Sequence, residues 1–511
     1  MDALFDKGAY LLSGGVVTGD QLKLVVSILS SYFFAMFYRN LEKPTVKHLY
    51  SITIALFTTL IVLKLYIGFL HISLTSLFSY IWMKYDHSYR GPWINFIFVM
   101  ISMSICHIDR QLKGNSGDTT LDYSGMMMIA TIKLTMYGFN IWDGRNDKKL
   151  PLTDYNNQMK ISQYPSVLEF SGWMLFFGGY LVGPACEFMD YLRFVHESQK
   201  DKQKRPSSLI PTLTIIAKSL ISITILLSCS SKYNFSSMLK PEWQAHSFLK
   251  KLLFIQIVAF VTRCKYYTVW FLSEGACVLC GFGFNGYDQK GKPLWDRVTN
   301  INAVHIELAQ SLKEYSDNWN MSANKWLKNY VYLRVTPPNK KAGLKSTLTT
   351  YAVSAFWHGF YPGYYIMFLS LALFQNVGRM SRRLIRPFML NDKNQSMMLR
   401  KSVYDVLGVI STAFIVNTMS ISFIGLYLHP ILLVWKNIYF IHYILGLLVF
   451  ILLKLAYSSL LKLQKKRAQQ FGYKSKIVTP PSTPKAIDMD VTDLTGAQPP
   501  EVDPKIIKKT N

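Results

Sequence analysis

The chain has 511 residues, of which 50% are hydrophobic and 17% charged, and its formal net charge is +26. The apolar residues are gathered into long runs, as in a polytopic membrane protein. The lysines and arginines fill the short segments between these runs, which argues against nucleic acid as a partner and favours anionic lipid and an anionic substrate.

The N-terminal segment, residues 1–20, has no basic region joined to a short apolar core, so no cleavable signal peptide is expected. From there the apolar runs predict an all-α membrane domain over residues 21–460, with about ten or eleven spans at roughly 20 residues each. The runs cover residues 22–38, 49–63, 65–83, 93–108, 126–142, 167–182, 209–229, 252–272, 348–374, 403–428 and 431–457. A basic tail that contains proline occupies residues 461–511.

Two carboxylates each follow an apolar run: Asp143 in Asn140-Ile-Trp-Asp-Gly144, and Glu274 in Ser273-Glu-Gly275. They could orient polar groups near a site, or cap backbone amides at the ends of helices. Between them, His196-Glu-Ser-Gln-Lys-Asp201 matches the HxxxxD pattern that marks the active site of one family of glycerolipid enzymes. It lies in a highly charged stretch without an apolar scaffold, which argues against a site there.

The six cysteines lie mostly in apolar context, and we interpret them as buried thiols, not as a disulfide framework. Cys277 and Cys280 have the CxxC spacing of a zinc site. No second pair and no histidine cluster accompanies them in the sequence, so no metal site is expected.

His358 lies within an apolar segment and is followed at once by Gly359, Pro362 and Gly363, which break a helix. An ionisable side chain at bilayer depth costs a few kcal/mol or more, so it predicts a function, unless it is a core histidine bonded to a backbone carbonyl. A neutral imidazole can take a proton from an alcohol. No serine or cysteine lies in a nucleophile elbow, so direct attack by an acceptor hydroxyl is favoured over a covalent intermediate.

Asn320 is the second candidate, because a buried amide can hold an alcohol or donate to a developing oxyanion. Asn320-Met-Ser322 also matches a glycosylation sequon, so interface polarity or a sugar is the alternative. Trp319 and Trp326 flank this segment and could share one helical face at the membrane interface.

Together, these two segments resemble the membrane-bound O-acyltransferases: Trp319-Asn320 and Trp326-Leu327 precede Trp357-His358-Gly359 and Gly363-Tyr364. Three further segments are similar to the fungal lysophospholipid acyltransferases of that family, namely residues 273–281, 284–288 and 329–335. The resemblance extends from about residue 95 to 386. The FYxDWWN-type motif of the sterol and diacylglycerol enzymes is not found in the sequence, which favours a phospholipid acceptor.

The resemblance implies helices around a central chamber, in which acyl-CoA gives a fatty acyl group to the free, by inference sn-2, hydroxyl of a lysophospholipid. No metal or other cofactor is implied. His358 would be the catalytic base and Asn320 its partner, with Asp143, Glu274, Trp357 and Trp319 in support. Basic residues before the histidine segment are candidates to meet the CoA phosphates, although each could be an ordinary solvated charge: Lys325, Lys328, Arg334, Lys340, Lys341 and Lys345.

In the tail, Thr479 and Thr483 each precede proline and could be phosphorylated. Lys508 and Lys509 are placed as in dilysine retrieval signals, which predicts an endoplasmic reticulum membrane protein with a cytosolic C-terminus and coat machinery as a partner. Three alternatives stay open: an acyltransferase for another hydroxyl, a transporter whose broken helix binds an anion, and a catalytically silent scaffold.

Overall fold

The computed structural model describes residues 2–15, 17–113, 122–146, 152–198, 201–202, 204–336, 343–390 and 398–470. Within these ranges all regular structure is helical apart from one isolated β-bridge, so the expected all-α class is confirmed. The tail residues discussed above, Thr479, Thr483, Lys508 and Lys509, lie outside the described residues, as do Lys340 and Lys341. The expected domain boundary at residue 460 falls inside a helix that runs from Tyr457 to Gln470.

The helices, in chain order, are α1 (Asp2–Ser13), α2 (Gly19–Tyr38), α3 (Pro44–Leu56), η1 (Phe57–Val62), α4 (Tyr66–Tyr85), α5 (Gly91–Leu112), α6 (Ser124–Arg145), α7 (Asp154–Met159), α8 (Val167–Met174), α9 (Phe188–Val195), α11 (Leu209–Cys229), η2 (Ser236–Leu239), α12 (Pro241–Gln244), α13 (Phe248–Leu279), α14 (Ala303–Glu307), α15 (Leu312–Asn318), α16 (Met321–Trp326), η3 (Leu327–Tyr332), α17 (Leu344–His358), α18 (Pro362–Ile385), η4 (Arg386–Met389), α19 (Met398–Gly425), α20 (Leu428–Asn437), α21 (Ile441–Leu455) and α22 (Tyr457–Gln470).

Seven helices of the described chain are long and apolar enough to cross a membrane: α2, α3 with η1, α4, α5, α11, α13 and α19. The pair α20 and α21, bent by 71°, would add an eighth. The expected number of ten or eleven is therefore not confirmed. One reason is that the apolar run 167–182 forms only the short helix α8 and then turns, and another is that the run 348–374 is divided between α17 and α18.

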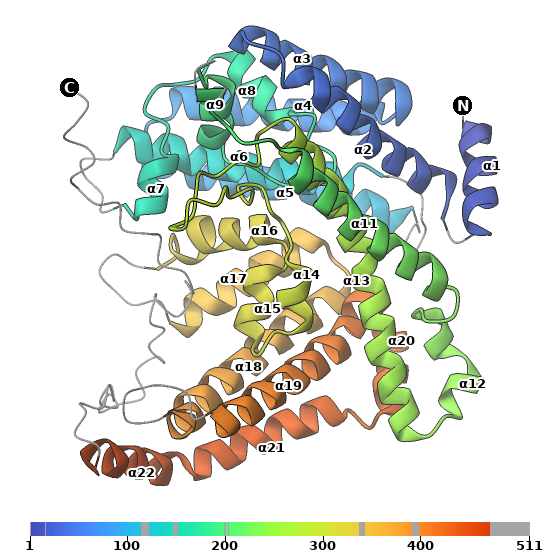
Figure 1. Ribbon diagram of the computed structural model, residues 1–511, viewed down its shortest axis with the longest axis vertical. Coiled ribbons are helices and arrows are strands. Elements are labelled where there is room, and N and C mark those ends of the chain that lie inside the picture. Colours follow the sequence, from blue (N-terminus) through green and yellow to red (C-terminus); the bar gives the residue numbers. More distant parts are fainter. Residues whose placement is uncertain are drawn as a thin grey trace.

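The helices fall into two groups along the long axis of the molecule. Figure 1 shows α2 to α9 at one end and α18 to α22 at the other, with α14 to α17 between them. The 32-residue helix α13 joins the two groups, because it packs against α2 and α11 and also against α19. Its Arg263 donates to both carboxylate oxygens of Glu307, at 2.8 and 2.6 Å, and to Oδ1 of Asn417 at 2.5 Å, which ties α13 to α14 and α19.

The hydrophobic interior determines where the candidate residues lie. The largest buried cluster comes from the N-terminal group of helices, yet it includes Trp326, Tyr330 and Trp357 from the middle of the chain. Trp326 is completely buried, and its Nε1 donates to Thr135 Oγ1 at 2.9 Å. Packing of this kind fixes α16, η3 and the end of α17 against the N-terminal helices.

Candidate functional site

His358 is the last residue of α17, and the backbone turns sharply after it. Gly359 has φ +117° and ψ −166°, a conformation that is essentially restricted to glycine, and Pro362 then starts α18. The His358 ring keeps accessible surface and makes no hydrogen bond to any described residue. Four aromatic rings surround it, with centroids 4.8 to 5.6 Å away: Trp357, Phe423, Phe368 and Tyr364. The imidazole is therefore held by apolar faces, and both of its nitrogens remain available.

A second histidine, which the sequence analysis missed, supports this turn. His107 on α5 lies with Nε2 3.1 Å from the carbonyl oxygen of Trp357. Because a carbonyl only accepts, Nε2 must carry the proton. Trp357 is fixed from its other side, since its Nε1 donates to the carbonyl of Met128 at 3.1 Å. The residue directly before His358 is thus held by α5 and α6.

Asn320 occupies an unusual backbone position. It is the N-cap of α16, with φ +44° and ψ +59°, and its side-chain oxygen accepts from the backbone of Ala323 at 3.4 Å. No hydrogen bond joins it to His358 within the described chain, and both side chains keep accessible surface. Asn320 follows α15, which packs against α18, the helix that begins just beyond His358. The two candidates are therefore linked through the packing of α15 and α17 against α18, and no described hydrogen bond joins their side chains.

Trp319 anchors the Asn320 segment to α13. Its ring lies 5.2 to 6.2 Å from four other aromatic rings: Trp270, Tyr266, Tyr315 and Tyr267. The expected supporting role of Trp319 thus corresponds to packing against the long helix.

Glu274 lies within α13 and is 4% exposed, so the interpretation of a cap at a helix end is wrong for it. Its Oε1 accepts from Thr299 Oγ1 at 2.6 Å, whereas its Oε2 is buried without a hydrogen-bond partner among the described residues. Asn300, the residue after Thr299, accepts two backbone bonds, from Met321 to its carbonyl at 2.9 Å and from Ser322 to its Oδ1 at 3.0 Å. Glu274 is therefore linked, through Thr299 and the adjacent Asn300, to the two residues that follow Asn320.

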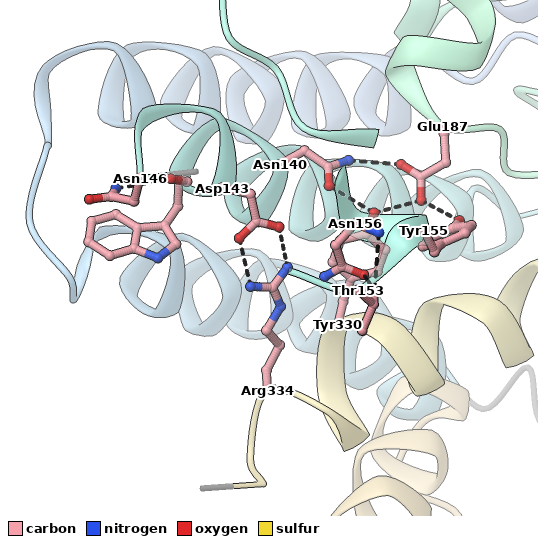
Figure 2. Close-up of polar contacts among 10 residues, drawn as sticks. Asn140, Asp143, Asn146, Thr153, Tyr155, Asn156, Glu187, Tyr330 and Arg334 are labelled. Atoms are coloured by element: carbon pink, nitrogen blue, oxygen red, sulfur yellow. Dashed lines mark hydrogen bonds and ion pairs between the residues drawn. The ribbon is translucent and has the colours of Figure 1, made fainter. Parts of the chain in front are cut away.

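Asp143 forms a two-pronged ion pair with Arg334, as Figure 2 shows. The carboxylate is completely buried in the last turn of α6, with Oδ1 2.7 Å from Nη1 of Arg334 and Oδ2 on Nη2. Capping of backbone amides is therefore wrong for Asp143 too. The same geometry corrects the expectation for Arg334, because a guanidinium already neutralised inside the protein has no free charge to offer a phosphate.

Glu187, just before α9, is the centre of the neighbouring polar cluster in Figure 2. Asn140 donates to its Oε2 at 2.8 Å, and the hydroxyls of Tyr155 and Tyr330 each donate to its Oε1 at 2.7 Å. Burial raises the pKa of the Glu187 carboxyl to about 7. No motif in the sequence indicated this residue, although Asn140 and Tyr330 lie in segments noted above.

The remaining basic candidates differ in their surroundings. Lys325 and Lys345 are exposed, whereas Lys328 is partly buried, and burial lowers the pKa of its ammonium group. The sequence analysis missed Lys265, which lies in the middle of α13 next to Tyr266 and close enough to Arg110 for the two cations to interact. Lys265 keeps a large accessible surface and has neither an ion pair nor a hydrogen bond to any residue in the described ranges.

Among the described residues, no group of three or more histidine, cysteine or carboxylate side chains is placed to hold a metal ion. All six cysteines carry free thiols, and five of them are buried. The described hydrogen bonds of the CxxC pair go to backbone carbonyls: Cys277 Sγ lies 3.2 Å from the carbonyl of Gly178, and Cys280 Sγ lies 3.2 Å from that of Cys277. His196 of the HxxxxD match is exposed and lies 3.7 Å from Glu169, away from His358 in sequence and packing.

Comparison with known proteins adds the following. The model of the membrane-bound O-acyltransferase family matches residues 110–422. The chain is 38% identical over 433 residues to a lysophospholipid acyltransferase of Schizosaccharomyces pombe, which covers 83% of this chain and 84% of that protein. It is 32% identical over 461 residues to a lysophospholipid acyltransferase of Saccharomyces cerevisiae, covering 86% and 74% respectively. A membrane-bound glycerophospholipid O-acyltransferase 1 of Mus musculus is 31% identical over 375 residues, covering 70% and 74%.

Proposed function

The chain belongs to the membrane-bound O-acyltransferase family, and we propose that it is a lysophospholipid O-acyltransferase that transfers a fatty acyl group from acyl-CoA to the sn-2 hydroxyl of a lysophospholipid. The observation that carries this proposal is the similarity, over more than four fifths of the chain, to two fungal proteins named lysophospholipid acyltransferase. The unbonded His358 in its aromatic surroundings supports it.

In the proposed mechanism, a ring nitrogen of neutral His358 takes the proton of the acceptor hydroxyl while the oxygen attacks the thioester carbonyl carbon of acyl-CoA. The tetrahedral intermediate then collapses, the C–S bond breaks, and the imidazolium returns the proton to the CoA thiolate. The side-chain amide of Asn320 donates to the developing oxyanion. The aromatic rings around His358 limit the access of water, which would otherwise hydrolyse the thioester. No metal or other cofactor takes part.

The lysophospholipid brings a phosphodiester into the protein, and an anion at membrane depth needs a cation. Lys265 fits this need, because it is a lysine without an anionic partner in the described chain and lies on a spanning helix beside Tyr266. The CoA phosphates would instead meet the basic residues that precede α17, with Lys325, Lys328 and Lys345 as the described candidates. Two substrates with separate anion sites can bind at the same time, as direct transfer requires.

The acyltransferase domain spans residues 21–460 in this proposal, and the protein resides in the endoplasmic reticulum membrane with a cytosolic C-terminus. Lys508 and Lys509 support the location through the dilysine pattern read by coat machinery.

The decisive experiment uses purified protein in nanodiscs, supplied with oleoyl-CoA and a panel of lysophospholipids, with release of free CoA and formation of diacyl product followed together. Wild type and His358→Ala are compared side by side. We expect product from wild type and a loss of at least about 10²-fold in the variant.

Equal turnover in folded His358→Ala protein would refute the proposed base. Absence of product across the panel from folded wild type would refute the lysophospholipid assignment and favour another hydroxyl acceptor. CoA-independent lipid or anion flux into proteoliposomes would instead support the transporter alternative.

A further inference from the structure

The segment 299–302 bridges, through hydrogen bonds, the interior of α13 and the start of α16. Asn320 is the residue at which α16 starts. Thr299 donates to the Glu274 carboxylate, and the next residue, Asn300, accepts from the backbone N–H groups of Met321 and Ser322. We propose that Glu274, Thr299 and Asn300 form a positioning relay that holds Asn320 in its catalytic orientation. This inference rests on the proposed function, in which Asn320 acts on the oxyanion.

Asn320 requires outside support because its own backbone is unfavourable. A positive φ is uncommon for any residue with a Cβ, although asparagine tolerates it better than most. The bond from the Asn320 side chain to Ala323 is long at 3.4 Å. This cap alone therefore fixes the side chain only weakly.

Asn300 supplies hydrogen-bond acceptors that the first turn of α16 lacks. The first backbone N–H groups of a helix have no partner within the helix. Two of them, on Met321 and Ser322, donate to the carbonyl and to the side chain of Asn300, which is itself only 2% exposed. A neighbouring segment thus caps α16 from outside. The backbone N–H of Asn302 also donates to the carbonyl of Asn318, at 3.1 Å, which holds the chain just before Asn320.

Glu274 fixes Asn300 in turn. A carboxylate buried within a spanning helix is costly, so packing alone would favour an apolar residue at this position. Its Oε1 accepts from Thr299 Oγ1, so the carboxylate sets the position of Thr299 and, through the peptide bond that follows, that of Asn300. Glu274 does not contact His358 or Asn320 in any described bond, which makes it a positioning residue.

The experiment measures kcat and both KM values for purified Thr299→Val, Asn300→Ala and Glu274→Gln proteins. Thr299→Val removes the hydroxyl while keeping the side-chain volume. We expect kcat to fall about 5- to 10-fold in the first two variants, with both KM values unchanged. Glu274→Gln should retain most of kcat, because the amide oxygen can still accept the bond from Thr299. Thr268→Val is the matched control: Thr268 is a buried threonine of α13 that donates only to Cys264 of its own helix, and its loss should leave kcat unchanged.

A double-mutant test separates positioning from general stabilisation. In the Asn320→Ala background, Thr299→Val and Asn300→Ala should have no further effect on kcat, because the residue they position is gone. A purely structural role would lower the activity of both backgrounds by the same factor. If Asn300→Ala does not yield a monodisperse protein, the isosteric Thr299→Val decides the question.

Several outcomes would overturn the relay: wild-type kcat in Thr299→Val, equal losses in both backgrounds, or full activity of Asn320→Ala. Absence of diacyl product from folded wild type would instead count against the proposed function. The two failures are therefore distinguishable within one set of assays.

Discussion

The ring of His107 donates from Nε2 to the carbonyl oxygen of Trp357, 3.1 Å away, across 250 residues of sequence. This carbonyl belongs to the last turn of α17, where backbone carbonyls have no N–H partner within the helix. The His107 side chain therefore supplies a hydrogen bond that the helix itself cannot make. The bond also fixes the peptide that leads into His358. His107, which belongs to none of the motifs recognised in the sequence, therefore sets the orientation of His358, the proposed base.

We expect His107→Leu to lower kcat by about 10-fold or more, because a buried carbonyl loses its donor and the end of α17 becomes free to shift. His107→Gln should retain more activity, since its amide can donate to the same carbonyl. Steady-state kinetics on purified protein, with size-exclusion profiles as the folding control, test this. Identical kcat values for the leucine variant and wild type would contradict the assignment.

Gly359→Ala should impair turnover strongly with little change in expression. The alanine would have to adopt φ +117°, and its Cβ would lie 3.3 Å from Nδ1 of His107. If the backbone shifts to relieve either the positive φ or the close contact, the side chain of the adjacent His358 changes its orientation. Gly378→Ala is the matched control, because that glycine lies within α18 and a Cβ there meets nothing within 4 Å. A fully active Gly359→Ala protein would show that the turn is not needed.

The ion pair of Asp143 and Arg334 predicts non-additive stability effects. Removing one partner leaves a buried charge uncompensated, and we expect Asp143→Asn and Arg334→Met each to lower the free energy of unfolding by about 3 kcal/mol. The double variant should be less destabilised than the sum of the two changes. Thermal unfolding of purified protein in detergent measures this. Strictly additive shifts in melting temperature would mean that the pair carries no mutual stabilisation.

Glu187 predicts a pH dependence of stability. Because the pKa of its buried carboxyl is about 7, against 4.5 for the ordinary group, the folded protein keeps a proton in this interval that the unfolded chain has lost. The free energy of unfolding should therefore fall by up to about 3 kcal/mol as the pH rises from about 4.5 to 7. Glu187→Gln lacks this contribution, so its melting temperature should fall less than that of wild type between pH 5 and 7.5. Parallel falls in the two proteins would rule out the linkage.

Lys265→Met should raise the KM for lysophospholipid about 10-fold and leave the KM for acyl-CoA unchanged, because the lost ammonium group would no longer meet the lipid phosphate. Lys251→Met is a suitable control on the same helix, since Lys251 bonds Asn437 at the far end of α13. A rise in the KM for acyl-CoA alone would assign Lys265 to the CoA phosphates.

The sequence predicted the helical class and the segments that carry His358 and Asn320, because long apolar runs and a histidine beside helix-breaking residues are local patterns. It did not predict that the helix ends at Met174 and that residues 175–182 form turns, since a buried loop can be as apolar as a span. His107 could have been predicted from the sequence, because it lies in the apolar run 93–108 and the argument applied to His358 applies to it equally.

The roles of Asn300 and Glu187 could not be predicted from the sequence. Their importance comes from which backbone groups and side chains surround them in space, and those partners lie 22 residues away for the Asn300–Ser322 bond and 143 for the Glu187–Tyr330 bond. Arg334 shows the opposite case, in which a correct position in the sequence suggested the wrong partner. Charge alone could not distinguish a phosphate ligand from one half of an internal ion pair.

Helix α13 holds the Asn320 region at three places along its length: Arg263 through Glu307, the rings of Tyr266, Tyr267 and Trp270 through Trp319, and Glu274 through Thr299. Because these attachments follow one rigid helix, the segment 299–322 cannot open piece by piece. In hydrogen exchange its protected amides should behave as one cooperative unit, with α13 as the element whose opening exposes them all.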